Sequence, residues 1–188
     1  MIAVRLADLA GAEVDAVLRP VTAEWTAPTP AMRRVELAAG PEVEARCQDL
    51  GELPVGSAVV TPAGSLPAQY LIHVVIRSLE QPSTPGVVQR ALRNGLRRVA
   101  EWGMASLALP PLGTGAGNLD AEESAELMVP ILLEYLRTAD PVPRVEVHVD
   151  SEYERDAFLG ELRRHGHAGD PAAPADPSAI GNPEAGST

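Results

Sequence analysis

The amino-acid sequence predicts an α/β fold in which helices cover both faces of a mixed, largely parallel sheet. Short apolar stretches suited to buried strands alternate with longer stretches of helical apolar spacing along most of the 188 residues. Connections of helical length are crossovers between parallel strands, and such sheets place ligands at loops after the carboxyl ends of strands. A chain of this length is expected to form one domain.

The first half of the chain contains four expected strands and one interrupted helix. The strands are expected at residues 2–6, 14–18, 57–61 and 70–77. A helical stretch runs from about residue 31 to residue 50. Gly40 and Pro41 interrupt this stretch, because neither residue propagates a helix well.

In the second half, Ser83, Thr84 and Pro85 provide the cap and first turn of a long helix that ends at Gly103. Further strands are expected at residues 106–109 and 144–150, and further helices at 120–137 and 152–164. The composition then changes to Ala, Gly and Pro, which bury too little apolar surface to offset the entropy of ordering. We therefore expect a domain over residues 1–165 and a disordered tail over residues 166–188.

Composition excludes several classes of function. The formal net charge is -11, and all 15 basic residues are Arg, so general binding to nucleic acids or anionic membranes is disfavoured. No apolar run reaches the ~18 residues of a membrane span, and the start lacks the basic lead of a signal peptide. The single Cys47 excludes a disulfide framework and a cysteine zinc cluster. We expect a cytoplasmic protein without a metal or cofactor.

The most informative segment joins an apolar strand to the next helix over residues 107–119. It contains glycines at the alternate positions 113, 115 and 117. Glycine permits positive φ and close backbone approach, so that N–H groups converge on an anion, and the following helix N-terminus adds its dipole. With the Thr114 hydroxyl, this pattern indicates a phosphate or pyrophosphate site. The alternative is a tight turn whose glycines serve packing alone.

Four segments that include this loop resemble the macro domain family, in the family's order. They are Val4-Arg-Leu-Ala-Asp-Leu9 with Val14-Asp-Ala-Val-Leu18, Ala38-Ala-Gly-Pro-Glu42, Gly56-Ser-Ala-Val-Val-Thr-Pro-Ala-Gly64 with Tyr70-Leu-Ile-His-Val-Val75, and Leu109-Pro-Pro-Leu-Gly-Thr-Gly115. The likeness spans about residues 2–164. It implies a three-layer α/β/α macro-type fold that binds ADP-ribose or a related nucleotide diphosphate, either free or linked to protein.

The resemblance also implies a set of ligand-binding residues. Asp8 matches the acid that accepts a hydrogen bond from the adenine amino group, with the Leu9 amide beside it, and Thr22 falls near the family's distal-ribose asparagine. The residues that match the loop around the diphosphate and distal ribose are Gly113, Thr114, Gly115, Ala116, Gly117 and Asn118. Without the resemblance, a solvated loop carboxylate or a helix cap is the favoured interpretation of Asp8.

The sequence departs from the hydrolytic type of macro domain in its first loop. Arg19-Pro-Val-Thr22 stands in place of the family's Asn-Ala-Ala-Asn run, and residues 23–31 contain no glycine. Glu24 and Glu36 are the nearby acids, and no catalytic residue is assigned. Pure ligand binding is the leading interpretation. An ADP-ribosyl hydrolase or O-acetyl-ADP-ribose deacetylase with a non-standard base, and a degenerate scaffold for protein contacts, are the alternatives.

Several polar residues within apolar surroundings admit a simpler interpretation. Arg19 either reaches an anionic group at the mouth of the crevice or pairs with a surface acid. His73 and His148 alternate with apolar residues in strands, which favours core histidines with satisfied hydrogen bonds. Cys47 has no His near it in the sequence, so packing is favoured over a nucleophilic role.

Overall fold

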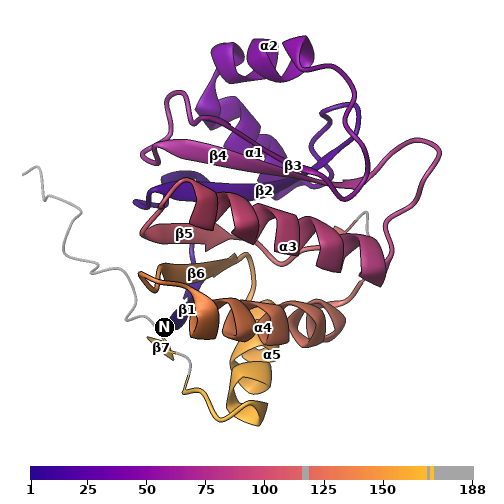
Figure 1. Cartoon of the computed structure of the whole chain (residues 1–188). Coiled ribbons are helices and arrows are strands. Elements are labelled where there is room, and N and C mark those ends of the chain that lie inside the picture. The colour runs from indigo at the N-terminus through magenta and orange to yellow at the C-terminus, as the bar shows by residue number, and fades with distance from the viewer. Residues whose placement is uncertain (116–118, 169, 172–188) are drawn as a thin grey trace, which may run out of the picture.

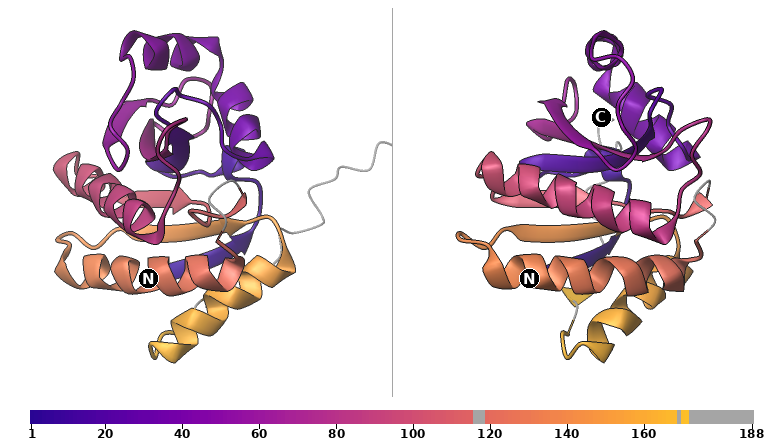
Figure 2. Two further views of the ribbon diagram at one scale, coloured as in Figure 1. Left: turned by 90° about the vertical axis from the view of Figure 1, so that its right-hand side faces the viewer. Right: turned by 45° about the vertical axis from the view of Figure 1, so that its right-hand side comes forward.

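The computed structural model describes residues 1–115, 119–168 and 170–171. These residues form three layers, with a central sheet between two layers of helices (Figures 1 and 2). The order of strands across the described sheet is β3-β4-β2-β5-β6-β1-β7. Within it, β3 pairs with β4 in the antiparallel direction, and the other pairings are parallel. The mixed, largely parallel α/β/α fold expected from the sequence is confirmed.

The strands run close to the expected positions. Their bounds are β1 Ile2–Leu6, β2 Ala16–Thr22, β3 Ala58–Pro62, β4 Tyr70–Arg77, β5 Ser106–Leu109, β6 Arg144–Val149 and β7 Asp170–Pro171. The largest shift is in β2, which runs over Ala16–Thr22 instead of residues 14–18. The carboxylate of Asp15 lies just before this strand. It accepts hydrogen bonds from the amides of Ala105 at 2.6 Å and Ser106 at 3.2 Å. Asp15 therefore fixes where β2 and β5 begin side by side.

The helices begin at conventional caps. They are η1 Leu9–Gly11, α1 Pro30–Ala39, α2 Pro41–Asp49, α3 Pro85–Glu101, α4 Ala121–Thr138 and α5 Glu152–Arg164. Thr29 caps α1 and Thr84 caps α3, each with proline in the first turn. The expected break at Gly40 is present, where φ is +92°. No helix among the residues described is long and apolar enough to cross a membrane.

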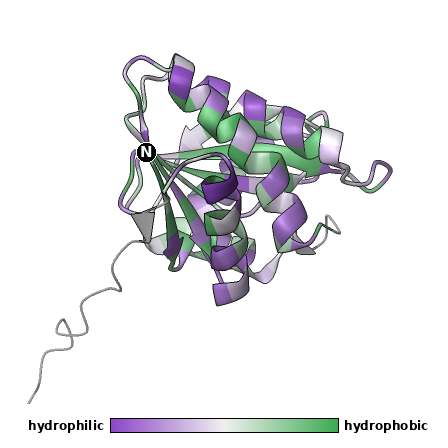
Figure 3. Ribbon diagram, turned by 90° about the horizontal axis from the view of Figure 1, so that it is seen from below, coloured by the Kyte–Doolittle hydropathy of each residue, from purple (hydrophilic) through white to green (hydrophobic). Residues whose placement is uncertain are grey.

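Each face of the sheet has its own apolar core. Side chains alternate along β2, so that Leu18 packs in the cluster formed with α3 and α4, while Val17 and Val21 pack in the cluster formed with α1 and α2. Figure 2 shows α3 and α4 on one side of the sheet and α1 on the other. In Figure 3 the apolar strands lie between helices whose outward positions are hydrophilic.

The end of the domain is described only in part. β7 pairs in parallel with β1, with Asp170 beside Ala3 and Pro171 beside Val4. Most of the tail expected over residues 166–188 lies outside the described residues. The division at residue 165 therefore stays a prediction.

Candidate functional site

A crevice of about 290 Å³ lies at the carboxyl ends of the parallel strands. This is the place where open α/β sheets bind ligands, because loops that follow neighbouring strands converge there. Its lining includes Leu9, Pro28, Thr29, Pro30, Arg34, Gly113, Thr114, Gly115, His148 and Asp150.

One wall of the crevice is the glycine loop after β5. Gly113 has φ +83° and Gly115 has φ +67°. A Cβ atom at Gly113 would lie 2.6 Å from the Leu119 side chain, and one at Gly115 would lie 3.0 Å from the methyl group of Thr29. The positive φ favours glycine at both positions, and a larger residue would also have to displace a neighbouring side chain.

The glycine loop can be followed only as far as Gly115. Thr114 lines the crevice, and its hydroxyl donates a long hydrogen bond of 3.4 Å to the carbonyl of Pro111. The remaining expected members of the loop, Ala116, Gly117 and Asn118, lie outside the described residues.

The opposite wall is the start of α1. The hydroxyl of Thr29 accepts a hydrogen bond from the amide of Met32, and Pro28 and Pro30 flank it without an N–H of their own. Thr29 and Gly115 both line the crevice, and a Cβ atom added to Gly115 would approach the Thr29 methyl group, so the two loops face each other here. The proline-containing first loop thus occupies a place beside the phosphate-type loop, although it offers fewer amide donors than a glycine loop would.

Ionic contacts link the loops after β1 and β6. The carboxylate of Asp8 accepts a hydrogen bond from the Ala10 amide at 3.2 Å, which caps η1, and lies 3.6 Å from Arg34. Arg34 also pairs with Asp150 at 3.0 Å. Leu9 is buried and lines the crevice. Asp8 therefore combines the cap suggested as the simpler interpretation with a position next to the candidate ligand site.

Thr22 is not brought into the crevice. Its hydroxyl accepts a hydrogen bond from the Thr26 amide at 3.0 Å, and its own amide donates to the Thr26 carbonyl at 3.1 Å. These bonds close the turn at the start of the first loop. Among the described residues Thr22 is not part of the crevice lining.

His148 is a crevice residue for which the sequence favoured a core role. It is 6% exposed, and its Nε2 lies 3.1 Å from the carboxylate of Glu146. Burial raises the pKa of Glu146, but hydrogen bonds from His148 and Arg5 outweigh it and lower the pKa overall. Because an ionised carboxylate only accepts, the Nε2 of His148 donates. Its Nδ1 has no hydrogen-bond partner among the described residues.

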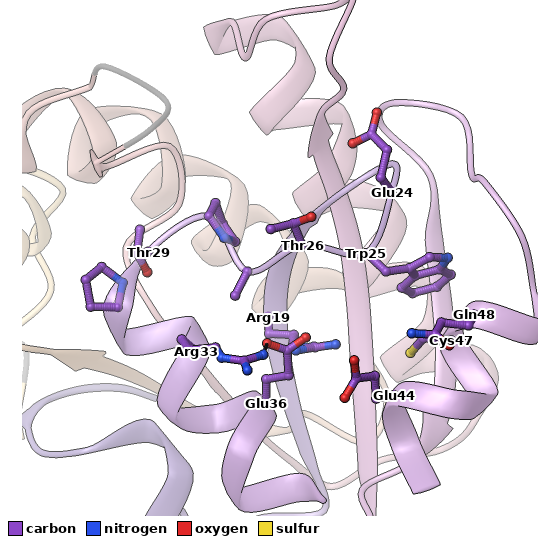
Figure 4. A pocket seen from close by; sticks show the side chains of 13 residues that line it. Arg19, Glu24, Trp25, Thr26, Thr29, Arg33, Glu36, Glu44, Cys47 and Gln48 are labelled. Atoms are coloured by element: carbon purple, nitrogen blue, oxygen red, sulfur yellow. Dashed lines mark hydrogen bonds and ion pairs between the residues drawn. The ribbon is translucent and has the colours of Figure 1, made fainter. Parts of the chain in front are cut away.

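A second and larger hollow, of about 540 Å³, lies on the other side of the first loop. It shares the segment Pro28–Pro30 with the crevice as a common wall. Figure 4 shows Arg19 of β2, Glu36 of α1, and Glu44 and Cys47 of α2 around this cavity. Glu24 and Glu36, the acids considered as catalytic bases, line this cavity and are absent from the described lining of the crevice.

Arg19 adopts neither of the two positions that the sequence suggested for it. It is 2% exposed, and its Nε donates to His73 Nδ1 at 2.9 Å. Since Arg only donates, the proton of neutral His73 is on Nε2, which donates to Thr61 Oγ1 at 2.8 Å, and this hydroxyl donates to the Pro62 carbonyl. Burial and the charge of Arg19 hold the pKa of His73 well below its usual value. The expected core histidine is therefore buried with both nitrogens bonded.

Cys47 lies close to a histidine in space, although not in sequence. Its sulfur is 3.9 Å from His73 Nε2. Burial raises the pKa of the Cys47 thiol. His73 Nε2 already carries a proton and cannot accept another from the thiol. Cys47 is thus a buried, protonated thiol rather than an activated nucleophile.

Comparisons with known proteins give one consistent family. The Macro domain family matches residues 33–128. A structure of the macrodomain of Oceanobacillus iheyensis with ADP superposes with a TM-score of 0.78 at 22% identity, covering 86% of this chain and 90% of that one. This second likeness concerns the fold alone.

Two groups of curated relatives are informative. An O-acetyl-ADP-ribose deacetylase of Klebsiella pneumoniae is 31% identical over 146 residues, covering 74% of this chain and 83% of the relative. An uncharacterized protein of Mycobacterium tuberculosis is 32% identical over 126 residues, which are 67% of this chain. The match spans 35% of that mycobacterial relative, so the chain corresponds to about a third of its length. No group of residues with metal-ligand character is present in the described part of the chain.

Proposed function

Because the chain belongs to the macro domain family, we propose that its crevice binds ADP-ribose or a related nucleotide diphosphate. The observation that carries this proposal is the pair Gly113 and Gly115, both at positive φ at the end of β5 and facing the start of α1. Such a loop brings backbone close to a diphosphate, and helix N-termini favour the negative charge. We assign the diphosphate and distal ribose to residues 113–118.

We assign the adenine to the other end of the crevice. Asp8 and the Leu9 amide are the proposed partners of the adenine edge. His148, whose Nδ1 has no hydrogen-bond partner among the described residues, also lines the crevice. No aromatic side chain follows β6 in the position where many macro domains stack the base. Arg34 offers a planar guanidinium there instead, held by Asp8 and Asp150.

The proposal favours binding without turnover. Glu24 accepts a hydrogen bond from the Leu79 amide, which lowers its pKa, and Glu36 pairs with Arg33. Both acids line the cavity on the far side of Pro28–Pro30, so neither is positioned as a base for a ligand in the crevice. The deacetylase relative makes turnover worth testing. We expect O-acetyl-ADP-ribose incubated with the protein to release acetate at the rate of the blank.

Calorimetric titration with ADP-ribose, ADP and AMP tests the binding proposal. We expect ADP-ribose to bind clearly more tightly than AMP, because the loop residues contact the diphosphate and distal ribose. Asp8→Ala should weaken ADP-ribose binding about tenfold, the effect of one lost hydrogen bond to a charged group. Asp156→Ala removes the same charge from an exposed site outside the crevice and should not change it. Equal affinity for ADP-ribose and AMP would contradict the assignment.

The expectations about partners and location belong to the same proposal. We include ADP-ribose linked to protein, since the crevice is formed by surface loops. The net charge of -11 argues against general nucleic-acid binding. A free buried thiol at Cys47 is compatible with the reducing cytoplasm, where we place the protein.

A further inference from the structure

The cavity beyond the first loop contains a buried cation with an unused donor. Arg19 is 2% exposed, and its Nε is committed to His73. Its Nη1 is buried and has no hydrogen-bond partner within the described part of the chain. A buried guanidinium N–H without an acceptor is costly, and a planar guanidinium pairs well with a carboxylate. The cavity of about 540 Å³ is large enough for a small organic ligand.

Arg19 is held in place rather than free to turn away. The Thr61–His73–Arg19 series of hydrogen bonds runs from β3 through β4 to β2 and fixes the guanidinium from behind. Trp25 packs edge-on against His73, with ring centroids 5.5 Å apart, and its indole donates to the Gly51 carbonyl at 2.7 Å. Arg19 lines the cavity, and its Nη1 is the nitrogen of this hydrogen-bonded network that has no partner among the residues described.

The other charges around Arg19 restrict what can bind. Glu36 is paired with Arg33, whereas Glu44 is exposed and has no ion pair among the residues described. Glu24 also lines the cavity. A phosphate dianion in the cavity would be repelled by these three carboxylates and attracted by two arginines, so its binding is unfavourable. A ligand that carries both a carboxylate and a cationic group complements Arg19 and the glutamates together.

We propose that this cavity binds a small zwitterion of the amino-acid class, with its carboxylate on Arg19 and its ammonium group facing Glu36 and Glu44. The ligand makes no covalent bond, because Cys47 at the cavity wall is a protonated thiol and the neighbouring His73 offers it no base. The site is separated from the crevice by Pro28–Pro30, so the ligand can bind there while the crevice is empty.

Tryptophan fluorescence of the full chain provides a direct test. Trp25 lines the cavity, and Trp102 is the second of the two tryptophans, 52% exposed and in contact with Tyr70. In a Trp102→Phe background, L-alanine and L-lysine should produce saturable changes in Trp25 emission. Acetate, methylammonium and inorganic phosphate, which each satisfy only one part of the site, should bind at least tenfold more weakly.

Two variants separate the ends of the ligand. Arg19→Met should weaken L-alanine binding tenfold or more, the factor expected when a hydrogen bond to a charged group is lost. Glu44→Gln is an exposed change that leaves the core intact. It should weaken the binding of L-alanine and leave the binding of acetate unchanged. Asp156→Ala is the matched surface control. If Arg19→Met does not fold, the Glu44→Gln comparison alone decides.

The proposal is overturned if no zwitterion gives a saturable signal, if phosphate binds as tightly as L-alanine, or if a folded Arg19→Met variant binds L-alanine as the parent does.

Discussion

The two hollows on either side of Pro28–Pro30 are built by different means. The crevice is shaped by backbone, through two glycines at positive φ, and its charged side chains pair with one another at the surface. The cavity is shaped by side chains, through one buried arginine held by a histidine and a threonine. Substitutions in the crevice should therefore change affinity more than stability, and substitutions behind the cavity should do the reverse.

The largest expected effect is on the backbone-shaped site. Gly115→Glu places a side chain at φ +67° against Thr29 and adds a negative charge where we place the diphosphate. We expect ADP-ribose affinity to fall more than about 100-fold in calorimetry, and stability to fall by about 1–2 kcal/mol from the left-handed backbone.

Gly103→Ala is the matched control, because Gly103 also has positive φ, +63°, but open space around it. It should lose similar stability while keeping full ADP-ribose affinity. An unchanged affinity in Gly115→Glu would remove the basis for placing a ligand at this loop.

The second-largest effect is a loss of stability, expected at the hydrogen bonds behind the cavity. Thr61→Val removes the acceptor of the His73 Nε2 proton and leaves a buried donor unpaired. We expect the free energy of unfolding in urea to fall by about 1–3 kcal/mol, with ADP-ribose affinity unchanged. Thr138→Val, at an exposed helix end, should change stability by less than about 0.5 kcal/mol. A loss of affinity in Thr61→Val would show that the two hollows are not energetically separate.

Acid should destabilise the cavity side through His73. Its pKa is well below the usual value in the folded protein, so the unfolded chain binds the proton first as pH falls. Stability is therefore complete above about pH 6.5 and decreases below it, by up to about 1.4 kcal/mol per pH unit. His73→Gln retains an acceptor for Arg19 and a donor for Thr61 but does not titrate. The free energy of unfolding, measured in urea between pH 7 and pH 5, should fall less steeply with decreasing pH in this variant than in the parent. An equal dependence on pH in both proteins would refute the contribution of His73.

The smallest effect is expected at the rim of the crevice. Arg34→Ala removes two half-exposed ion pairs, each worth less than about 1 kcal/mol, so the melting temperature should hardly change. ADP-ribose affinity should fall by about tenfold or less if the guanidinium contacts the base. Arg34→Lys retains the positive charge but not the planar guanidinium group, and it should lose nearly as much ADP-ribose affinity as Arg34→Ala. Full affinity in Arg34→Lys would show that charge alone matters there.

Local patterns made most of the fold predictable. The cap of α3 and the break at Gly40 each depend on residues adjacent in sequence, and the structure shows both. Thr22 was harder to interpret, because its hydroxyl is used by the turn that follows it. The backbone after β2, rather than the family alignment, determines what this residue contacts.

The cavity was not predictable, because it depends on residues that are distant from one another in the sequence. Arg19, His73 and Thr61 come from three strands, and Cys47 from a helix, so their proximity exists only in the folded chain. An arginine between Leu18 and Pro20 in an apolar strand was the available signal. It marked an unusual residue without indicating which face of the sheet it occupies.

The common wall Pro28–Pro30 has a thermodynamic consequence for the two proposed ligands. If an amino acid in the cavity shifts this segment, and thereby changes ADP-ribose affinity by some factor, then ADP-ribose must change amino-acid affinity by the same factor. Thr29 lines both the crevice and the cavity, so a displacement of this segment changes the walls of both. The fraction of the protein that has ADP-ribose bound would then depend on the concentration of the amino acid.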